Sequence, residues 1–419
     1  MPDLQRQVER DRVWAMPLEA IDPSKGWLFE HDLVDLHFER LRSEDPVHLS
    51  PSKRYGPYWS VTRYQDIMAV DTNPAAFSSD AHRGGITLAE RPPSEVLPSF
   101  IAMDEPRHGQ QRKTVSPIVA PANLALLEAT IRQRAATILD DLPIGEPFDW
   151  VQRVSIELTT QMLATLFDFP FEQRQLLTWW SDMATGDPDG NGPVQSWAMR
   201  LTELGKCRDH FTQLWNQRVN AEPGPDLISM LAHSPATRDM APDEYLGNVI
   251  LLIVGGNDTT RNSISGGLLA LNQFPAEYDK LRTNPALVAS LVPEIIRWQT
   301  PLVHMRRTAL QDTVLADKLI RKGDKVVMWY LSGNRDETAI AQANQFIIDR
   351  ARPRQHLSFG FGIHRCVGNR LAELQLTVLW QEILQRFPCI EVVGTPKRTR
   401  SNFVRGFLTM PVRIPQRLN

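Results

Sequence analysis

Apolar and polar residues recur along most of this chain with the spacing of amphipathic helices. Apolar side chains separated by three or four residues predict helices, and this pattern extends over six long segments. They are residues 122–142, 154–167, 194–218, 243–272, 286–299 and 369–386. Proline is tolerated in the first turn of a helix but disrupts its interior, so we expect the regular part of the fifth segment to begin at Pro293.

Short runs of β-branched and aromatic residues between turns predict a small sheet. These runs are residues 46–49, 57–62, 325–331, 390–393 and 407–412. Strands from both ends of the chain must then meet in space. We therefore predict one interwoven domain over residues 1–419, mainly α with a small β region (α+β).

The charge and the apolar segments of the chain exclude some classes of protein. Its 46 Lys and Arg residues nearly balance 49 Asp and Glu residues, so no overall field attracts nucleic acid or a membrane. The apolar stretch 249–254 is far shorter than the ~20 residues of a membrane span, and the amino terminus lacks the apolar run of a secretory signal. The three cysteines include no C-x-x-C pair, which argues against a disulfide framework or a zinc site. We expect a soluble, cytoplasmic protein.

Several common catalytic motifs are absent. The chain has no G-x-x-x-x-G-K-[ST] phosphate loop, no H-E-x-x-H zinc pair and no G-x-S-x-G nucleophile elbow. The run Gly360-Phe361-Gly362 lacks the third glycine of a dinucleotide-binding fingerprint, and the ten histidines are spread singly. The chemistry must therefore reside in another kind of site.

The segment HLSFGFGIHRCVGNRLAE, residues 356–373, surrounds one cysteine with glycines, which allow positive φ and close approach to a flat ligand. Cys366 directly precedes a predicted helix whose N–H groups and dipole favour a thiolate, and His364 and Arg365 add positive charge. A buried free cysteine in a glycine-bearing loop is the simpler explanation of these residue types. The spacing is more specific: Phe359-x-x-Gly362-x-x-x-Cys366-x-Gly368.

This loop resembles the heme-binding loop of the heme-thiolate monooxygenases, the cytochromes P-450. The resemblance implies a heme b cofactor with the Cys366 thiolate as its iron (metal) ligand, and O2 as co-substrate. It implies that His364 donates to a heme propionate, that Phe359 packs beside the sulfur, and that Gly360 and Gly368 also contact the cofactor. The resemblance extends over nearly the whole chain. It implies a monomeric P-450 fold, with heme between the long central helix and the cysteine loop and no fused reductase or ferredoxin.

The predicted helix 243–272 is about 45 Å long, enough to cross the molecule. Gly255 and Gly256 in its middle each cost the helix about 1 kcal/mol. A close crossing with another helix would explain these glycines by itself. The resemblance instead implies a helix that opens locally over the heme, with Thr259 as a hydrogen-bond donor to O2 and Asp258 as the acid that relays protons.

Glu294 and Arg297 are spaced i, i+3 and so share one helix face. By resemblance they form a buried structural pair that a later arginine completes, and both Arg350 and Arg352 fit that role. The resemblance also implies a set of basic residues that donate to the heme propionates. They are His108, Arg112, His304 and Arg306.

The residues that would face the heme from the substrate side imply an apolar ligand, although core packing gives the same composition. They are Ile86, Leu88, Leu97, Phe100, Ile101, Leu251, Val254, Gly255, Leu302, Val303, Phe407 and Leu408. The strings GGNDTTRNSISGG and IIRWQTPLVHMRRTA resemble the bacterial P-450 subfamily that hydroxylates medium-chain alkanes and fatty acids at the terminal carbon. Such selectivity requires a narrow channel that presents the chain end-on. The sequence does not distinguish an alkane substrate from a fatty acid, and it does not indicate the chain length.

The resemblance also implies a ferredoxin and an NAD(P)H-fed ferredoxin reductase as electron donors. Residues 350–370 contain five arginines and no Asp or Glu. Two of them, Arg354 and Arg365, predict together with Lys113 a positive patch that would attract an acidic ferredoxin. Two alternatives are a heme hydroxylase driven by peroxide and a heme-binding sensor or carrier without O2 activation. The Asp258-Thr259 pair argues against the sensor, because a carrier needs no proton delivery.

Overall fold

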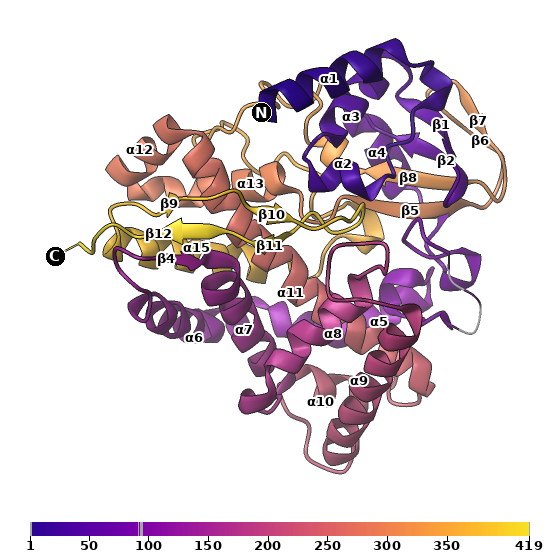
Figure 1. Ribbon diagram of the computed structural model, residues 1–419. Helices are drawn as coiled ribbons and strands as arrows, with labels where there is room; N and C mark the ends of the chain where they lie inside the picture. The colour runs from indigo at the N-terminus through magenta and orange to yellow at the C-terminus, as the bar shows by residue number, and fades with distance from the viewer. Residues whose placement is uncertain (1, 91, 93–94, 419) are drawn as a thin grey trace.

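The computed structural model describes residues 2–90, 92 and 95–418. A long helix, α11 (Pro242–Gln273), runs through the middle of the molecule. In Figure 1 the main sheet lies at the upper right of this helix, and most of the other long helices lie below it. The carboxyl-terminal strands lie on the left, next to α15.

The main sheet joins segments that are far apart in the sequence. Its strand order is β1-β2-β8-β5-β3, with β2 and β8 parallel and the other neighbours antiparallel. This order confirms that strands from the two halves of the chain meet. The strands are β1 (Val47–Ser52), β2 (Gly56–Val61), β3 (Phe77–Ser78), β5 (His304–Ala309) and β8 (Lys325–Trp329).

Three smaller sheets complete the β region. The predicted strand 407–412 is divided between two of them, because the chain leaves one sheet at Met410 and pairs with β4 from Pro411 onward. The small sheets contain β4 (Pro147–Asp149), β9 (Glu391–Val392) and β12 (Pro411–Arg413); β10 (Lys397–Arg398) and β11 (Phe407–Thr409); and β6 (Thr313–Leu315) and β7 (Lys318–Ile320).

Helices make up most of the remaining structure. A π-helical segment, Val151–Ile156, directly precedes α7. The other α-helices are α1 (Pro2–Ala15), α2 (Gly26–Glu30), α3 (Val34–Glu44), α4 (Tyr64–Asp71), α5 (Arg107–Val115), α6 (Pro121–Asp140), α7 (Glu157–Phe167), α8 (Gln175–Thr185), α9 (Trp197–Arg218), α10 (Leu227–His233), α12 (Pro275–Thr283), α13 (Val288–Gln299), α14 (Tyr330–Gly333) and α15 (Asn369–Arg386).

The six predicted helices are all present, but α13 begins earlier than expected. It starts at Val288, so Pro293 lies in its interior rather than in its first turn. Proline there removes the hydrogen bond to the carbonyl of Ala289. Leu291, Val292 and Ile295 are nearly completely buried, and this burial offsets the lost hydrogen bond.

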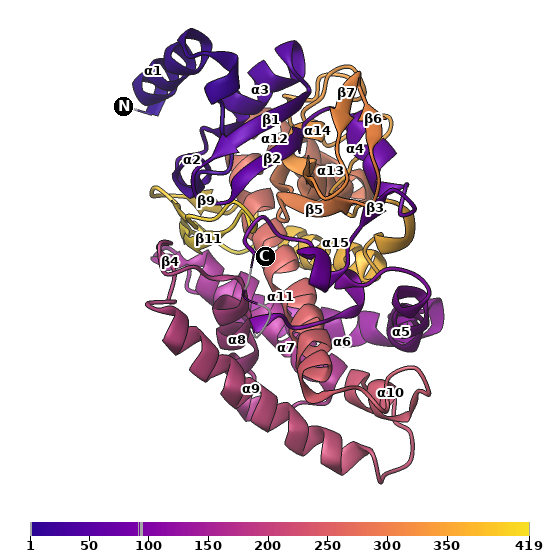
Figure 2. The ribbon, with the colours of Figure 1, turned by 90° about the vertical axis from the view of Figure 1, so that its right-hand side faces the viewer.

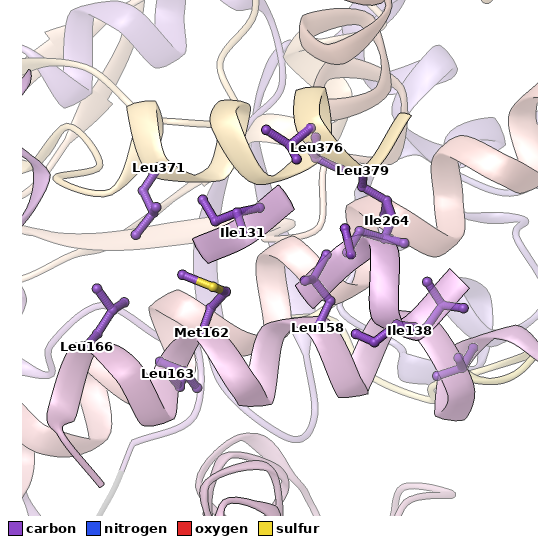
Figure 3. Close-up of a cluster of buried hydrophobic side chains, with 14 of the residues drawn as sticks. Ile131, Ile138, Leu158, Met162, Leu163, Leu166, Ile264, Leu371, Leu376 and Leu379 are labelled. Carbon is purple, nitrogen blue, oxygen red and sulfur yellow. The ribbon is translucent and has the colours of Figure 1, made fainter. Parts of the chain in front are cut away.

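The largest hydrophobic core lies between α6, α7, α11 and α15. Figure 3 shows apolar side chains from these four helices converging, with Ile131 from α6, Met162 from α7, Ile264 from α11 and Leu376 from α15. All four side chains are at most 1% exposed. This close packing holds α11 and α15 in fixed positions, and these two helices form walls of the site described next.

Candidate active site

A cavity of about 770 Å³ lies between α11 and the loop that contains Cys366. The start of α15, part of α5, strand β5 and residues within 81–90 and 95–102 also contribute to its walls. Most of the side chains that line it are apolar, and the thiol of Cys366 forms part of one wall. The cavity therefore combines a nucleophilic or metal-binding sulfur with a predominantly apolar enclosure.

The cysteine loop is held against the carboxyl end of α4. Gly360 and Gly362 both have φ of +64°, which favours glycine. A Cβ at Gly362 would lie 2.5 Å from the carbonyl oxygen of Asp71, so a larger residue would displace the loop. These two glycines therefore let the loop pack on α4, whereas Gly368 has open space around it and lines the cavity.

The Cys366 sulfur is set between the loop and the amino terminus of α15. The Cys366 N–H donates to the carbonyl of Phe359 over 2.8 Å, which places Phe359 beside the cysteine. Burial raises the pKa of the Cys366 thiol, while the N–H of Gly368 and the charges of Arg112 and Arg365 lower it. The groups that favour a thiolate are present as predicted, but the desolvation of the sulfur outweighs them.

Asp71, which was not predicted, ties the cysteine loop to the sheet. Its Oδ2 accepts hydrogen bonds from the Phe361 N–H over 2.7 Å and from the Tyr330 hydroxyl over 3.0 Å. Its Oδ1 lies 2.9 Å from Nη2 of Arg307, and both side chains are at most 3% exposed. One buried carboxylate thus joins α4, β5, α14 and the cysteine loop. No motif in the sequence marks Asp71, because its partners are more than 200 residues away.

Two of the predicted propionate donors do not line the cavity. Alternate residues of a strand point to opposite faces, and on β5 Met305 and Arg307 line the cavity whereas His304 and Arg306 do not. Arg306 pairs with Glu90 over 3.1 Å, and Nδ1 of the fully buried His304 lies 2.8 Å from the carbonyl of Asn402. Arg307 is therefore the cavity-facing arginine of this strand.

His108, Arg112 and His364 do line the cavity. The two imidazole rings contact one another with centroids 4.1 Å apart. Nδ1 of His364 is buried without a hydrogen-bond partner, whereas both ring nitrogens of His108 lie within 2.9 Å of carbonyl oxygens of Phe100 and Ile363. Burial lowers the pKa of His364 to about 2, so this ring is neutral. Arg112 donates to the carbonyl of Arg365 and stays at the cavity wall.

Helix α11 is continuous past the cavity, so the expected local opening is absent from it. The hydroxyl of Thr259 donates to the carbonyl of Gly255 over 2.9 Å, and both residues line the cavity. The glycines differ in role. A Cβ at Gly255 would meet nothing, whereas at Gly256 it would lie 2.7 Å from Leu163 of α7. Close helix packing thus accounts for Gly256, and exposure to the cavity for Gly255.

Asp258 does not line the cavity and is fully buried. Its carboxylate accepts from Ser181 over 3.0 Å and from Thr185 over 3.1 Å, and it lies 2.8 Å from Nη2 of Arg261. Burial raises the pKa of Asp258, and Arg261 opposes this shift. Thr185 itself lines the cavity, so its hydroxyl is the group that connects Asp258 with the cavity wall.

The Glu294–Arg297 pair forms as predicted and is completely buried. Two hydrogen bonds of 2.7 Å join the side chains, and Arg297 also donates to three backbone carbonyls. Arg350 approaches Glu294 to 3.2 Å, whereas Arg352 is exposed. Arg350 is therefore the third member of the group.

Eight of the twelve predicted substrate contacts line the cavity: Ile86, Leu97, Phe100, Ile101, Leu251, Val254, Gly255 and Leu302. The other four are wrong. Leu88 and Val303 are buried in the core beneath the main sheet, and Phe407 and Leu408 are in β11. The segment before β11 reaches the cavity instead, through Phe403.

The site defines a class of protein: an enzyme in which a loop cysteine faces a long helix across an apolar cavity. The sequence profile of the cytochrome P-450 family matches residues 206–415. The chain is 37% identical to linalool 8-monooxygenase of Pseudomonas putida, over 91% of this chain and 95% of that protein. It is 31% identical to methyl-branched lipid omega-hydroxylase of Mycobacterium tuberculosis, over 92% of both chains. The solved structure of CYP153D17 from Sphingomonas sp. PAMC 26605 is 47% identical, with a TM-score of 0.87 and coverage of 94% and 98%.

The chain belongs to the cytochrome P-450 family, which confirms the resemblance, the fold and the assignment as an O2-dependent monooxygenase. Members of this family bind heme through a cysteine thiolate and use O2 as co-substrate. No single helix in the described residues is long and apolar enough to cross a membrane; the bent pair 107–119 and 121–140 passes that test together, by length and composition only.

The residues around the cavity fit a heme group. Cys366 offers one sulfur, and the open faces at Gly255 and Gly368 leave room for a flat ligand. The unpartnered Nδ1 of His364 and the positive charges of Arg112 and Arg307 suit the two carboxylates of heme.

Proposed function

We propose that this monooxygenase hydroxylates the terminal carbon of an apolar chain, either a medium-chain alkane or a fatty acid. The observation that carries the proposal is the apolar lining of the cavity that Cys366 and Thr259 share, to which Leu97, Phe100, Leu251 and Val254 contribute. The names of two relatives, a linalool 8-monooxygenase and a methyl-branched lipid omega-hydroxylase, agree with an apolar substrate.

The heme, when bound, supplies the binding and reductive activation of O2. The protein supplies the surroundings of that reaction. The apolar wall orients the substrate and excludes water. The Thr259 hydroxyl is a proton-bearing group at the cavity surface of α11. Behind it, the raised pKa of Asp258 makes this carboxyl a suitable proton donor, and Thr185 links it to the cavity.

The test of the substrate class is a titration of the holoenzyme with matched series of n-alkanes and fatty acids, followed by product analysis. We expect a change of heme spin state on binding and an excess of the terminal alcohol over its subterminal isomers. Leu251→Ala should widen the cavity and shift oxidation toward subterminal carbons. Subterminal products as the main fraction from the unaltered enzyme would contradict the proposal.

We further propose that electrons come from an acidic ferredoxin that docks beside the cysteine loop, in a cytoplasmic, monomeric, single-domain enzyme. One residue of the predicted patch is corrected: Arg354 pairs with Glu373 over 3.1 Å. Lys113, Arg365 and Arg370 are exposed and, among the described residues, have no carboxylate oxygen within 4.0 Å of their charged groups. These three cations form the docking patch in this proposal.

The docking patch is tested by charge reversal. Lys113→Glu should slow reduction of the iron by ferredoxin severalfold at low salt and leave substrate affinity unchanged, because attraction between exposed charges steers association. Lys397→Glu is the matched control: β10 pairs with β11 on the left of Figure 2, whereas α5 lies on the right. If the rate of iron reduction does not depend on salt and is the same in Lys113→Glu and Lys397→Glu, ferredoxin docks at another surface. Turnover with peroxide but not with ferredoxin would favour the peroxide-driven alternative.

A further inference from the structure

A second cavity of about 420 Å³ lies where α1 and α3 meet α11, α13 and β10. None of the described residues that line it also lines the cavity around Cys366. Six of its lining residues are arginines, and three are carboxylates. We call it the arginine cavity, and its arginines are Arg6, Arg10, Arg42, Arg335, Arg398 and Arg405.

The three carboxylates are already paired with four of these arginines. At the mouth, Arg6 pairs with Asp35, and Arg10 with Glu39. Asp32 is shared by two arginines that are more buried: its Oδ1 lies 2.6 Å from Arg405 and its Oδ2 lies 3.2 Å from Arg398. The carboxylates thus compensate the charges of Arg6 and Arg10 one to one, whereas Arg398 and Arg405 share a single carboxylate.

Arg42 and Arg335 have no carboxylate oxygen within 4.0 Å among the described residues. Arg335 is 8% exposed, donates only to the carbonyls of Ala343 and Trp298, and stacks 3.4 Å from the Trp298 ring centroid. Arg42 donates to the carbonyl and hydroxyl of Ser332. Burial lowers the pKa of Arg335 well below its usual range; the charges of Arg297 and Arg405 add to this effect, and Asp35 and Asp32 oppose it.

Two guanidinium nitrogens of the buried arginines Arg398 and Arg405 also lack hydrogen-bond partners. Nε of Arg405, a side chain more than nine-tenths buried, and Nη1 of Arg398 are both inaccessible to solvent and make no hydrogen bond. Buried charges and donors without partners are costly in a folded protein. The two nitrogens themselves do not face the cavity, so the positive charge that its wall presents without a carboxylate partner is that of Arg42 and Arg335.

We propose that the arginine cavity binds a phosphate group. The guanidinium fork matches phosphate oxygens and forms paired, charge-assisted hydrogen bonds with them. The arginines outnumber the carboxylates by three, which suits a multiply charged anion better than a monocarboxylate. The volume is many times the ~30 Å³ of one water, so a small phosphate ester fits as well as the free ion.

Calorimetric titration of the holoenzyme with inorganic phosphate tests the site, with sodium chloride at equal ionic strength as the reference. We expect saturable one-to-one binding to phosphate alone. Arg335→Gln should weaken it about tenfold or more, because a hydrogen bond to a charged group contributes at least ~1.5 kcal/mol. Arg42→Gln, at a less buried position, should weaken it in the same direction. Arg238→Gln is the control, because this exposed arginine lies outside the cavity.

A second titration with adenosine 5′-monophosphate distinguishes a free ion from a phosphate ester. Tighter binding than inorganic phosphate, lost in the Arg335 variant, assigns the cavity to an ester; equal or weaker binding assigns it to the ion. The proposal is overturned if phosphate gives no more heat than chloride, or if the variants bind phosphate like the unaltered protein. If Arg335→Gln does not fold, the phosphate affinity of Arg42→Gln tests the proposal instead. The substrate-induced heme spectrum stays unchanged in both variants, so this result is independent of the proposed substrate.

Discussion

Replacement of Asp71 by asparagine is the sharpest test of how this fold holds its cysteine loop. The carboxylate accepts from Phe361 N–H, from Tyr330 and from Arg307 over 2.7 to 3.0 Å, and the contacts with Tyr330 and Arg307 are buried. The variant removes the negative charge, leaves Arg307 without its carboxylate and turns an amide N–H₂ toward one of the donors. Breaking a buried ion pair from one side costs about 3–5 kcal/mol.

We therefore expect Asp71→Asn to lower the free energy of unfolding by about 3–5 kcal/mol. Because the lost contact holds the cysteine loop, we also expect part of the reduced, CO-bound protein to lose the thiolate-type absorption band. Denaturant unfolding, followed by heme absorbance and by tryptophan fluorescence, measures the first effect. A CO difference spectrum measures the second.

Asp66→Asn is the matched control, because Asp66 lies on the same helix and makes no hydrogen bond through its side chain among the described residues. A change within about 0.5 kcal/mol is expected there. Our reasoning is refuted if Asp71→Asn unfolds at the same denaturant concentration as the control and keeps the full thiolate band. A loss of stability with an intact band would limit Asp71 to a structural role away from the sulfur.

Three further outcomes are expected. Cys366→Ala abolishes the thiolate-type CO spectrum, whereas Cys207→Ala, which changes a fully buried thiol of the helical core, keeps it; an unchanged spectrum in Cys366→Ala would contradict the assignment. Thr259→Ala still binds heme and substrate but diverts electrons to hydrogen peroxide, and Thr259→Ser restores coupling; product yield per NAD(P)H measures this. Burial lowers the pKa of His304 to about 4 in the folded protein, from about 6.5 in the unfolded chain. Between about pH 6.5 and 4 the unfolded chain therefore binds a proton that the folded protein does not, and acidification destabilises the fold. His304→Gln should reduce that slope by about 1.4 kcal/mol per pH unit, as measured by unfolding at several pH values.

The parts of the site that the sequence determined are those encoded over short distances. The cysteine loop was identifiable because Phe359, the glycines and Cys366 follow one another within ten residues. Helix α15 has the bounds that its apolar periodicity predicts, and Glu294 and Arg297 share a helix turn. A helix repeats every 3.6 residues, so the relative directions of nearby side chains follow from their spacing alone.

Tertiary structure alone decided which residues of the strands and loops reach the cavity. The side of β5 that faces inward depends on its pairing with β8, so adjacent Arg306 and Arg307 could not be told apart by spacing. Arg350 and Arg352 differ only in how the segment after α14 folds back on Glu294. Asp71 acquires its role from partners more than 200 residues away, and the arginine cavity from segments at both ends of the chain. Such contacts depend on long-range packing, which no local pattern encodes.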